Sequence, residues 1–377
     1  MERWAHRKQA GLQALGAIIA ATTMWTACAA SPGESGRRGE APGETPQGLS
    51  RVAFGSCAHQ DKPQPIWGAI LAAAPERFLF IGDNVYGDVK TDDPEMPELR
   101  NAYEKLSKIE DFQTFRARTP ILPMWDDHDF GLNDGGADFG LKREAQALFV
   151  AFWGIDREDA RVRRPGLYHA QIEGSPGRRV QLILLDTRSF RSALTPSQTP
   201  GQPGRERYQP EADPERTMLG DRQWAWLKEQ LERPAEVRLI ASGVQILAEG
   251  HGYERWGNLP LERARLFELL GQTQAGGVVL LSGDRHLGAL YRSTPGIHPA
   301  VEGRYPIHEL TSSALNMPMS GPGDGPDAAR VGEVYTRENF GLVEIDWSTG
   351  VLTLSLRDLE GEAVMEQTIV LADLPGR

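Results

Sequence analysis

Five short apolar runs in this chain each stop at residues that bind metals or carry protons. The runs are RVAFGSC, FLFIGD, ILPMWDDHD, VQLILLD and VVLLSGDRH, and the residues are Cys57, Asp83, Asp126, Asp127, His128, Asp129, Asp186, Asp284 and His286. Such runs between helical stretches are typical of buried strands in an α/β domain. Ligands of open α/β sheets bind outside the carboxyl ends of the strands, so we expect these side chains to share one cleft. A single Asp after a strand is more simply a turn residue or a helix N-cap, but five such endings indicate a common site.

The acidic composition limits the partners of the chain. Its 377 residues carry a formal net charge of -11, with 40% hydrophobic and 25% charged residues. This composition is typical of a folded, soluble chain. A net negative chain is a poor partner for a phosphate backbone, so no nucleic-acid partner is expected. An acidic protein that acts on anions needs local cations, which bound metal ions supply.

The first 27 residues have the pattern of an export signal. A positively charged start precedes an uncharged, mostly apolar stretch that is shorter and more polar than a membrane span. The stretch ends at Cys28, as in a bacterial lipoprotein signal, although Trp25 stands where such signals usually have an aliphatic residue. We expect residues 1–27 to be a signal peptide and Cys28 to carry a lipid, with ordinary cleavage near the Ala-rich stretch as the alternative. The protein would be exported, and periplasmic or lipid-anchored at the bacterial cell envelope.

The remainder of the chain divides into a tether and one domain. Residues 28–49 are rich in Gly, Pro, Ser and Glu, which is typical of a flexible tether. From residue 50 to 377 the pattern predicts helices over 65–74, 98–117, 142–152 and 262–270, a helix capped by Asp221, and antiparallel strands over 341–346, 351–356 and 364–371. The Pro- and Gly-rich stretch 193–216 predicts a long loop, which we expect to arch over the cleft because it follows the strand that ends at Asp186.

Carboxylates and imidazoles at the strand ends predict a metal site. These groups bind divalent and trivalent ions. The candidate ligands of this type are Asp83, Asp126, Asp127, Asp284 and His286. Gly82 and Gly283 each precede one of the aspartates, and a glycine lets the backbone approach an ion closely.

A thiol and a phenol among the candidate ligands indicate which metal the site binds. Cys57 ends the first strand, and Tyr86, about one helical turn beyond Asp83, is expected to face the same site. A thiolate and a phenolate together favour ferric iron over magnesium. A disulfide between Cys57 and Cys28 is the least favoured alternative, because it would tie a flexible tail to a core strand. His128, which lies between two aspartates, is a candidate general acid.

Six motifs together resemble one known family. FGSC, FIGDNVYGD, MWDDHDFGLND, LLDTRSFR, LGDRQWAWL and LLSGDRH, in this order from about Arg51 to Ser313, are similar to motifs of the alkaline phosphatase D (PhoD-like) family of metallophosphoesterases. The resemblance implies an α/β fold, a four-layer αββα sandwich of two sheets flanked by helices. It also implies hydrolysis of phosphate monoesters or diesters with Fe3+ and Ca2+ as cofactors. Larger members carry an N-terminal β-sandwich domain, where this chain has only the tether.

The resemblance also assigns roles to the metal-binding residues. Cys57, Asp83 and Tyr86 are similar to iron ligands of the family, and Asp83 would also bridge to the second metal. Asp284 and His286 resemble the closing Gly-His-x-His motif of the superfamily, with Asp replacing its first His.

Asp127 and His128 are assigned in the same way, whereas Asn133, Arg188 and Arg191 are candidates by their chemistry. Asp127 takes the place that Asn holds in a Gly-Asn-His motif, so His128 corresponds to the catalytic His. Asn133 is a further candidate metal ligand. Arg188 and Arg191, in DTRSFR, are expected either to clamp phosphate or to form salt bridges.

The implied reaction is metal-assisted hydrolysis. A metal-bound hydroxide would attack phosphorus in line while His128 protonates the leaving alkoxide. The partner would be a small phosphate ester or a phospholipid headgroup. One alternative is a phospholipid-directed phosphodiesterase, which a membrane tether favours. The other is a non-catalytic exported metal-binding protein, but a purely structural metal site would not need the extra imidazole of His128.

Overall fold

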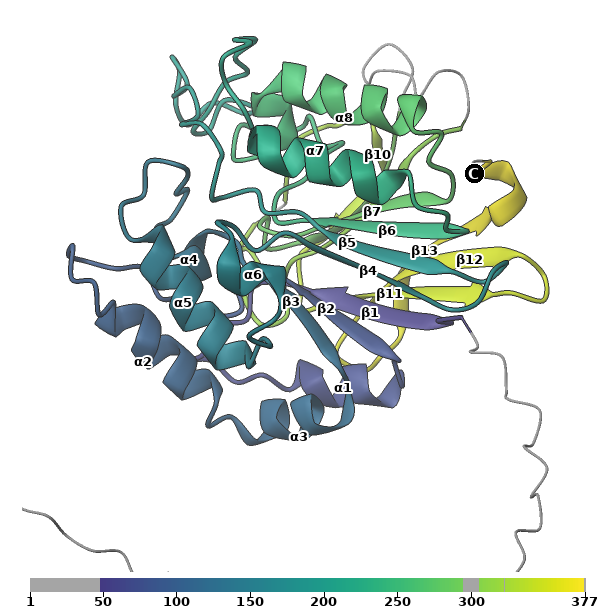
Figure 1. Ribbon diagram of the computed structural model, residues 1–377, viewed down its shortest axis with the longest axis horizontal. Coiled ribbons are helices and arrows are strands. Elements are labelled where there is room, and N and C mark those ends of the chain that lie inside the picture. Colours follow the sequence, from purple (N-terminus) through teal and green to yellow (C-terminus); the bar gives the residue numbers. More distant parts are fainter. Residues whose placement is uncertain (1–47, 294–304, 322, 376–377) are drawn as a thin grey trace, which may run out of the picture. The chain divides into compact units, whose positions relative to one another are not determined.

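In the computed structural model, two β-sheets form the centre of the fold (Figure 1). The first has six strands in the order β13-β12-β11-β1-β2-β3. Their bounds are β1 Arg51–Gly55, β2 Arg77–Ile81, β3 Ile121–Met124, β11 Phe340–Asp346, β12 Val351–Arg357 and β13 Ala363–Val370. β1, β2 and β3 are parallel, so their carboxyl ends lie at one edge, and the last three strands extend the sheet in antiparallel pairs as predicted.

The second sheet has seven strands in the order β10-β8-β9-β7-β6-β5-β4. Their bounds are β4 His169–Glu173, β5 Val180–Leu184, β6 Val237–Ser242, β7 Val278–Ser282, β8 Gly288–Arg292, β9 His308–Ser312 and β10 Arg330–Tyr335. The central strands β5, β6, β7 and β9 are parallel and wholly buried. Near-continuous apolar runs such as VQLIL and VVLLS suit strands that are covered on both faces.

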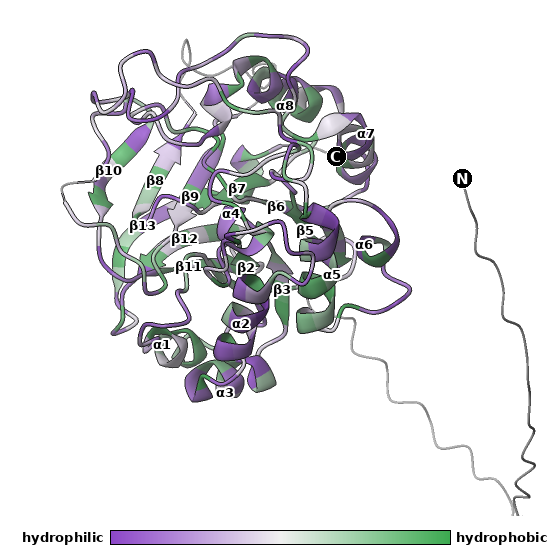
Figure 2. Ribbon diagram, turned by 90° about the vertical axis from the view of Figure 1, so that its left-hand side faces the viewer, coloured by the Kyte–Doolittle hydropathy of each residue, from purple (hydrophilic) through white to green (hydrophobic). Residues whose placement is uncertain are grey.

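Helices cover the outer face of each sheet and complete the predicted four layers (Figure 1). The helices beside the first sheet are α1 Ile66–Ala72, α2 Pro97–Leu106, α3 Glu110–Arg118 and α5 Lys142–Trp153, and those over the second are α7 Gly220–Leu231 and α8 Pro260–Gln272. The short helices are α4 Asp127–Phe130, α6 Ala160–Arg163 and two 3-10 turns, Trp256–Asn258 and Leu371–Asp373. Figure 2 shows hydrophobic residues along the strands and hydrophilic ones on helices such as α7.

Aromatic packing joins the first sheet to its helices. Trp67 of α1 stacks on Phe115 of α3 at 4.9 Å between ring centroids and meets Phe78 and Phe80 of β2 edge-on. These four side chains are fully buried. Burying a side chain of this size contributes about 1.5–3 kcal/mol, so this cluster fixes the strands that carry the site.

The structure describes residues 48–293, 305–321 and 323–375, which all belong to the unit formed by residues 45–377. The predicted signal peptide, Cys28 and most of the predicted tether lie outside the described residues. The last two tether positions, Gly48 and Leu49, are buried, and the Leu49 carbonyl accepts a 2.9 Å hydrogen bond from the indole of Trp347. No helix in the described part of the chain is long and apolar enough to cross a bilayer.

The predicted helix over 98–117 is two helices, α2 and α3. Ile109, between them, has extended backbone angles, and the Gln113 side chain donates to the Ser107 carbonyl at 2.6 Å. The buried Phe112 does not continue the helical phase of the apolar face of α2, so the chain must turn to bury it. Asp221 does not cap α7, because the N-cap residue is Leu219 and Asp221 lies in the first turn.

The strands that the sequence pattern misses lack a continuous apolar run. β9 carries His308 and the buried Glu309, whose carboxylate accepts hydrogen bonds from the backbone of Ile246 and Leu247 at 3.0 and 2.6 Å. The edge strands β4 and β10 are only partly covered, and β8, GALYR, begins with a glycine and ends with an exposed arginine. Such strands form because the sheet offers them partners, a tertiary effect that a local pattern does not carry.

Candidate functional site

The candidate site lies where strand ends of both sheets meet. Cys57, Asp83, Asp126 and Asp284 each lie two residues past the end of a strand, namely β1, β2, β3 and β7. A cavity of about 250 Å³ opens beside them. Of the residues predicted from the sequence, its lining includes Asp127, His128, Asn133, Asp284 and His286. Four of the five predicted strand ends therefore lie at one site, and the fifth, at Asp186, does not contribute to its metal clusters.

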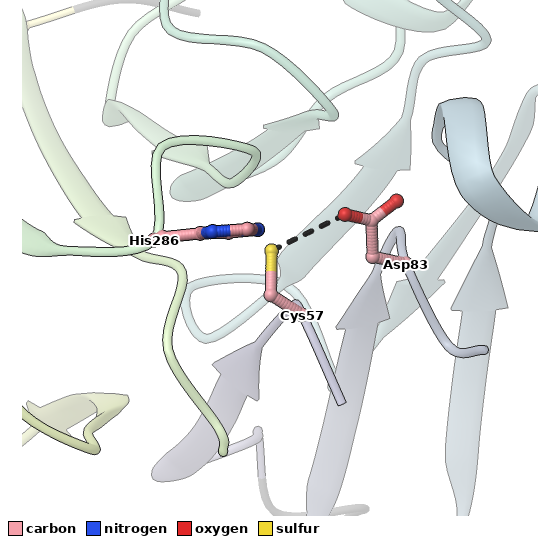
Figure 3. Close-up of side chains that lie close together, drawn as sticks. All are labelled: Cys57, Asp83 and His286. Carbon is pink, nitrogen blue, oxygen red and sulfur yellow. Dashed lines mark hydrogen bonds between the residues drawn. The ribbon is translucent and has the colours of Figure 1, made fainter. Parts of the chain in front are cut away.

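Cys57, Asp83 and His286 form the first candidate metal cluster (Figure 3). One ligand atom from each lies within 4.8 Å of the others, and Cys57 Sγ is 3.4 Å from Asp83 Oδ2. Burial raises the pKa of the Cys57 thiol to about 11, so the thiolate that binds metals needs a nearby cation. Burial also lowers the pKa of His286 to about 4, and a neutral imidazole is the form that binds metals.

Tyr86 reaches the same cluster, although not from a helix. Its hydroxyl is 2.9 Å from His286 Nε2, and the segment around it is irregular, so the helical spacing we expected is wrong. The ring lies between two imidazoles, with centroids 4.9 Å from His59 and 4.2 Å from His128. Burial, followed by the charge of Cys57, raises the pKa of the Tyr86 phenol, so the phenolate that binds metals also needs a nearby cation.

A second group of carboxylates adjoins the first cluster. Asp83, Asp127 and His128 come within 4.8 Å of one another, as do Asp126, Asp127 and Asp284. Asp83 thus belongs to two clusters. Burial, followed by the charges of neighbouring anions, raises the pKa of Asp83 and of Asp284. Such crowded, buried carboxylates are stabilised as anions only by a cation, so the donor set fits bound metal ions.

An unpaired oxygen supports the same conclusion. Asp126 Oδ2 is buried and has no hydrogen-bond partner among the described residues. Its other oxygen, Oδ1, accepts a 2.6 Å hydrogen bond from Arg188. A buried carboxylate oxygen without a partner is costly, and an ion would supply the partner.

The ligand backbone is held in an unusual conformation. Cys57, Asp83, Asp284 and His286 have φ angles of 63°, 47°, 68° and 56°, in the left-handed region that residues other than glycine rarely adopt. Each such residue costs on the order of 1–3 kcal/mol, and such residues concentrate at functional sites. The strand-end turns therefore aim these side chains into the site at some cost in stability.

The two predicted glycines allow close packing at these turns. A Cβ atom on Gly82 would lie 2.4 Å from Cβ of Asp126, and one on Gly283 would lie 2.5 Å from Oγ of Ser56. Neither position has room for a side chain. The glycines thus bring neighbouring ligand-bearing turns together.

His128, in the short helix α4, lines the cavity next to these clusters. Its Nδ1 lies 2.6 Å from Asp88 Oδ2, and its Nε2 has no hydrogen-bond partner among the described residues. Its backbone N–H donates to Asp127 Oδ1 at 3.0 Å and to Asp83 Oδ1 at 3.4 Å. Burial alone would lower the pKa of His128, but the charges of Asp127, Asp83 and Asp88 outweigh it and raise the pKa to about 11.

Arg188 and Arg191 lie behind the cavity and form buried ion pairs. Arg188 is fully buried, and its Nε donates to Asp126 at 2.6 Å while Nη1 pairs with Glu254 at 2.5 Å. Arg191 Nη2 lies 2.8 Å from Glu254 Oε1 and also donates to the carbonyls of Asp134 and Gly135. These are the contacts of the salt-bridge alternative, and neither arginine lines the cavity.

The structure adds residues that the sequence reasoning did not single out. Asp88 closes the motif GDNVYGD, so its position in the motif was a usable signal. The backbone N–H of Asp134 donates to Asp127 Oδ2 at 2.8 Å, and Asp134 forms a fourth acidic cluster with Asp127 and Glu254. Glu254 lies in an irregular segment without a motif, and nothing local identifies it. Burial raises its pKa to about 7 in spite of its arginine partners.

Two predicted polar positions stand apart from the metal clusters. Asn133 is exposed and lies at the cavity lining. Asp186 has the ordinary role of a strand-end aspartate, because its carboxylate accepts hydrogen bonds from the backbone of Leu167, Arg188 and Ser189. It shapes the turn that carries Arg188.

Comparisons with known proteins agree with this site. A family model described as PhoD-like phosphatase matches residues 52–356, whereas no curated protein matches the chain. A solved structure described as "Structure of PhoD" is 16% identical, with a TM-score of 0.63, and the match covers 88% of this chain and 70% of that one. The Plasmodium protein described as "GAP50 the anchor in the inner membrane complex of Plasmodium" is 13% identical, with a TM-score of 0.53 and coverage of 88% and 90%. At these identities both structures are similar in fold alone. The family match over most of the domain shows that the chain belongs to the PhoD-like phosphatase family, whose members are metal-dependent phosphoester hydrolases.

Proposed function

We propose that the protein is an exported hydrolase of phosphate monoesters and diesters. The observation that carries this proposal is that candidate metal ligands and His128 line one cavity. The cavity, about 250 Å³, is below the roughly 300–1,000 Å³ of sites that enclose drug-sized ligands. It therefore suits the phosphoryl group and the first atoms of the leaving group. Export rests on the N-terminal sequence pattern.

The proposed metals follow from the donor atoms. Cys57, Tyr86 and Asp83 offer sulfur, phenol and carboxylate donors, a set that suits Fe3+. Asp127, with Asn133 at the cavity rim, offers oxygen donors of the kind that Ca2+ takes. When bound, ions in such a site activate water for attack and neutralise charge on the phosphoryl oxygens.

The protein's own part in the chemistry centres on His128. Asp88 holds its Nδ1, so Nε2 is the nitrogen that would donate a proton to the leaving oxygen. The Tyr86 ring packs against the imidazole at 4.2 Å between centroids and limits its rotation. The His128 backbone N–H holds Asp83 and Asp127, so the proton donor and the metal ligands are positioned by one residue.

We assign Arg188 and Arg191 to positioning rather than to phosphate binding. Arg188 holds Asp126 through Oδ1 and thereby directs Oδ2. Both arginines hold Glu254. The assignment is supported by their burial and by the cavity lining, which includes neither of them.

The iron assignment predicts a coloured protein. A tyrosinate bound to ferric iron absorbs visible light by charge transfer, so the purified protein should show such a band. Tyr86→Phe should remove the tyrosinate part of the absorption while retaining part of the iron, because Cys57 and Asp83 remain. Absorption spectra together with elemental analysis test this. A colourless wild-type protein that contains only zinc would contradict the assignment and indicate a di-zinc hydrolase.

A chromogenic assay tests the proposed activity against its alternative. Purified wild-type protein should hydrolyse p-nitrophenyl phosphate or its diester, and chelation should abolish turnover. The alternative is a non-catalytic exported metal-binding protein. The similarity in fold to a protein described as an anchor is the observation that favours it. Stoichiometric metal without hydrolysis of either ester would favour that alternative.

Membrane attachment is expected to depend on Cys28. If a lipid is attached there, Cys28→Ala should release the protein from the membrane fraction or leave it uncleaved, and Ser31→Ala should have no effect. Cell fractionation and the mass of the mature N-terminus measure this outcome. A wild-type protein that is fully soluble in the periplasm would rule out lipidation, and with it the main support for a phospholipid substrate.

A further inference from the structure

The long loop predicted over 193–216 carries an arginine into the active-site cavity. Arg207 lines the cavity together with Asp127, His128 and His286. Its Nη1 donates to Asp134 Oδ2 at 2.6 Å. The side chain is nevertheless 49% exposed, so a large part of this cavity-lining side chain remains accessible.

The loop holds Arg207 in a fixed position. The backbone N–H groups of Arg207 and Tyr208 donate to the Gly252 carbonyl at 3.1 and 2.7 Å. The Tyr208 hydroxyl donates to the same Asp134 oxygen as Arg207, at 2.7 Å. Asp134 in turn contacts the candidate ligand Asp127 through its backbone N–H. The loop is therefore tied to the edge of the metal site at two points.

The other arginines near the cavity form ion pairs with buried carboxylates. Arg285 also lines the cavity, but its side chain is 9% exposed, pairs with Asp324 and stacks on Tyr253 at 4.2 Å. Arg188 and Arg191 are buried in ion pairs with Glu254. Among the described residues that line the cavity, Arg207 is thus the accessible guanidinium.

We propose that Arg207 binds a non-bridging oxygen pair of a dianionic phosphate and so gives the enzyme a preference for phosphate monoesters over diesters. This inference rests on the proposed phosphoesterase function. A monoester carries about -1.5 to -2 charge near pH 7, whereas a diester carries one negative charge and has one fewer free oxygen. Attraction to a guanidinium scales with that charge, and the planar fork matches two phosphoryl oxygens. A bound phosphate would share Arg207 with Asp134.

The test compares three variants on two substrates. Arg207→Ala should lower kcat/KM for p-nitrophenyl phosphate by about 10- to 100-fold, the size of losing a hydrogen bond to a charged group, and should lower that for bis-p-nitrophenyl phosphate several-fold less. Arg207→Lys, which keeps the charge without the fork, should fall between. Arg205→Ala is the matched control, because Arg205 is an exposed arginine of the same loop that does not line the cavity.

A binding measurement and one further variant separate the possible explanations. Inorganic phosphate should bind Arg207→Ala at least about 10-fold more weakly than wild type by calorimetry, with unchanged metal content. Tyr208→Phe removes the other donor to Asp134 and should keep the monoester preference. Equal losses for both esters, or the same loss in Tyr208→Phe, would overturn the inference. A metal-loaded wild type that hydrolyses neither ester would instead refute the proposed function.

Discussion

Replacing His128 with Ala is expected to lower kcat by roughly 10²–10⁴-fold, the usual contribution of a general acid, while most of the bound metal remains. The loss should depend on the leaving group. Alkyl phosphates need protonation of the leaving oxygen and should lose most activity, whereas a nitrophenolate leaves with little help and should lose least. Steady-state rates over a series of esters, together with metal analysis, measure both effects.

Asp284→Asn is the matched contrast to His128→Ala. Asp284 lies in a cluster with Asp126 and Asp127, so the loss of its charge should lower metal occupancy and activity together. If His128→Ala also loses its metal, His128 is a ligand rather than an acid, which its closeness to Asp83 and Asp127 would permit. Equal losses for good and poor leaving groups would leave it as an electrostatic group in the transition state.

Arg188→Ala is expected to destabilise the fold by about 3–5 kcal/mol, because it leaves buried anions without their cation. Asp126 and Glu254 are at most 2% exposed and both pair with this guanidinium. A loss of this size is a large part of the roughly 5–15 kcal/mol that stabilises a typical domain. Urea unfolding of metal-free protein measures the change without a contribution from the ions.

Two further variants make the Arg188 result interpretable. Arg188→Lys keeps a positive charge and should recover part of the stability if Arg188→Ala does not fold. Arg143→Ala removes an exposed arginine and should change the stability by no more than about 0.5 kcal/mol. Normal stability of Arg188→Ala combined with a raised KM would instead support the phosphate clamp that the DTRSFR motif suggested.

The strands and their reactive ends were predictable because they depend on local pattern. β5 and β7 lie in the predicted runs VQLILLD and VVLLSGDRH, since each run is apolar and long enough for one buried strand. The ends could then be placed together, because parallel strands put their carboxyl ends at one edge. Cys57 and Asp83 meet for this reason, 3.4 Å apart.

The rest of the site depends on contacts between distant segments. Glu254 becomes significant only because the fold brings Arg188 and Arg191 to it, and its own sequence carries no motif. A motif likewise cannot tell whether an arginine faces a substrate or a buried aspartate. Arg207 illustrates the same limit, since the loop was expected over the cleft but the pattern did not indicate which residue reaches it.

The ligands of the first cluster come from both sheets, and this affects the amount of intact protein. Cys57 and Asp83 follow β1 and β2 of one sheet, whereas His286 follows β7 of the other. An ion bound by all three is a cross-link between the sheets, and its binding free energy adds to that of folding. Free metal at 100 times its dissociation constant adds about 2.7 kcal/mol. The amount of intact protein would then follow the metal available where the chain folds, and starvation for that metal would lower abundance as well as turnover.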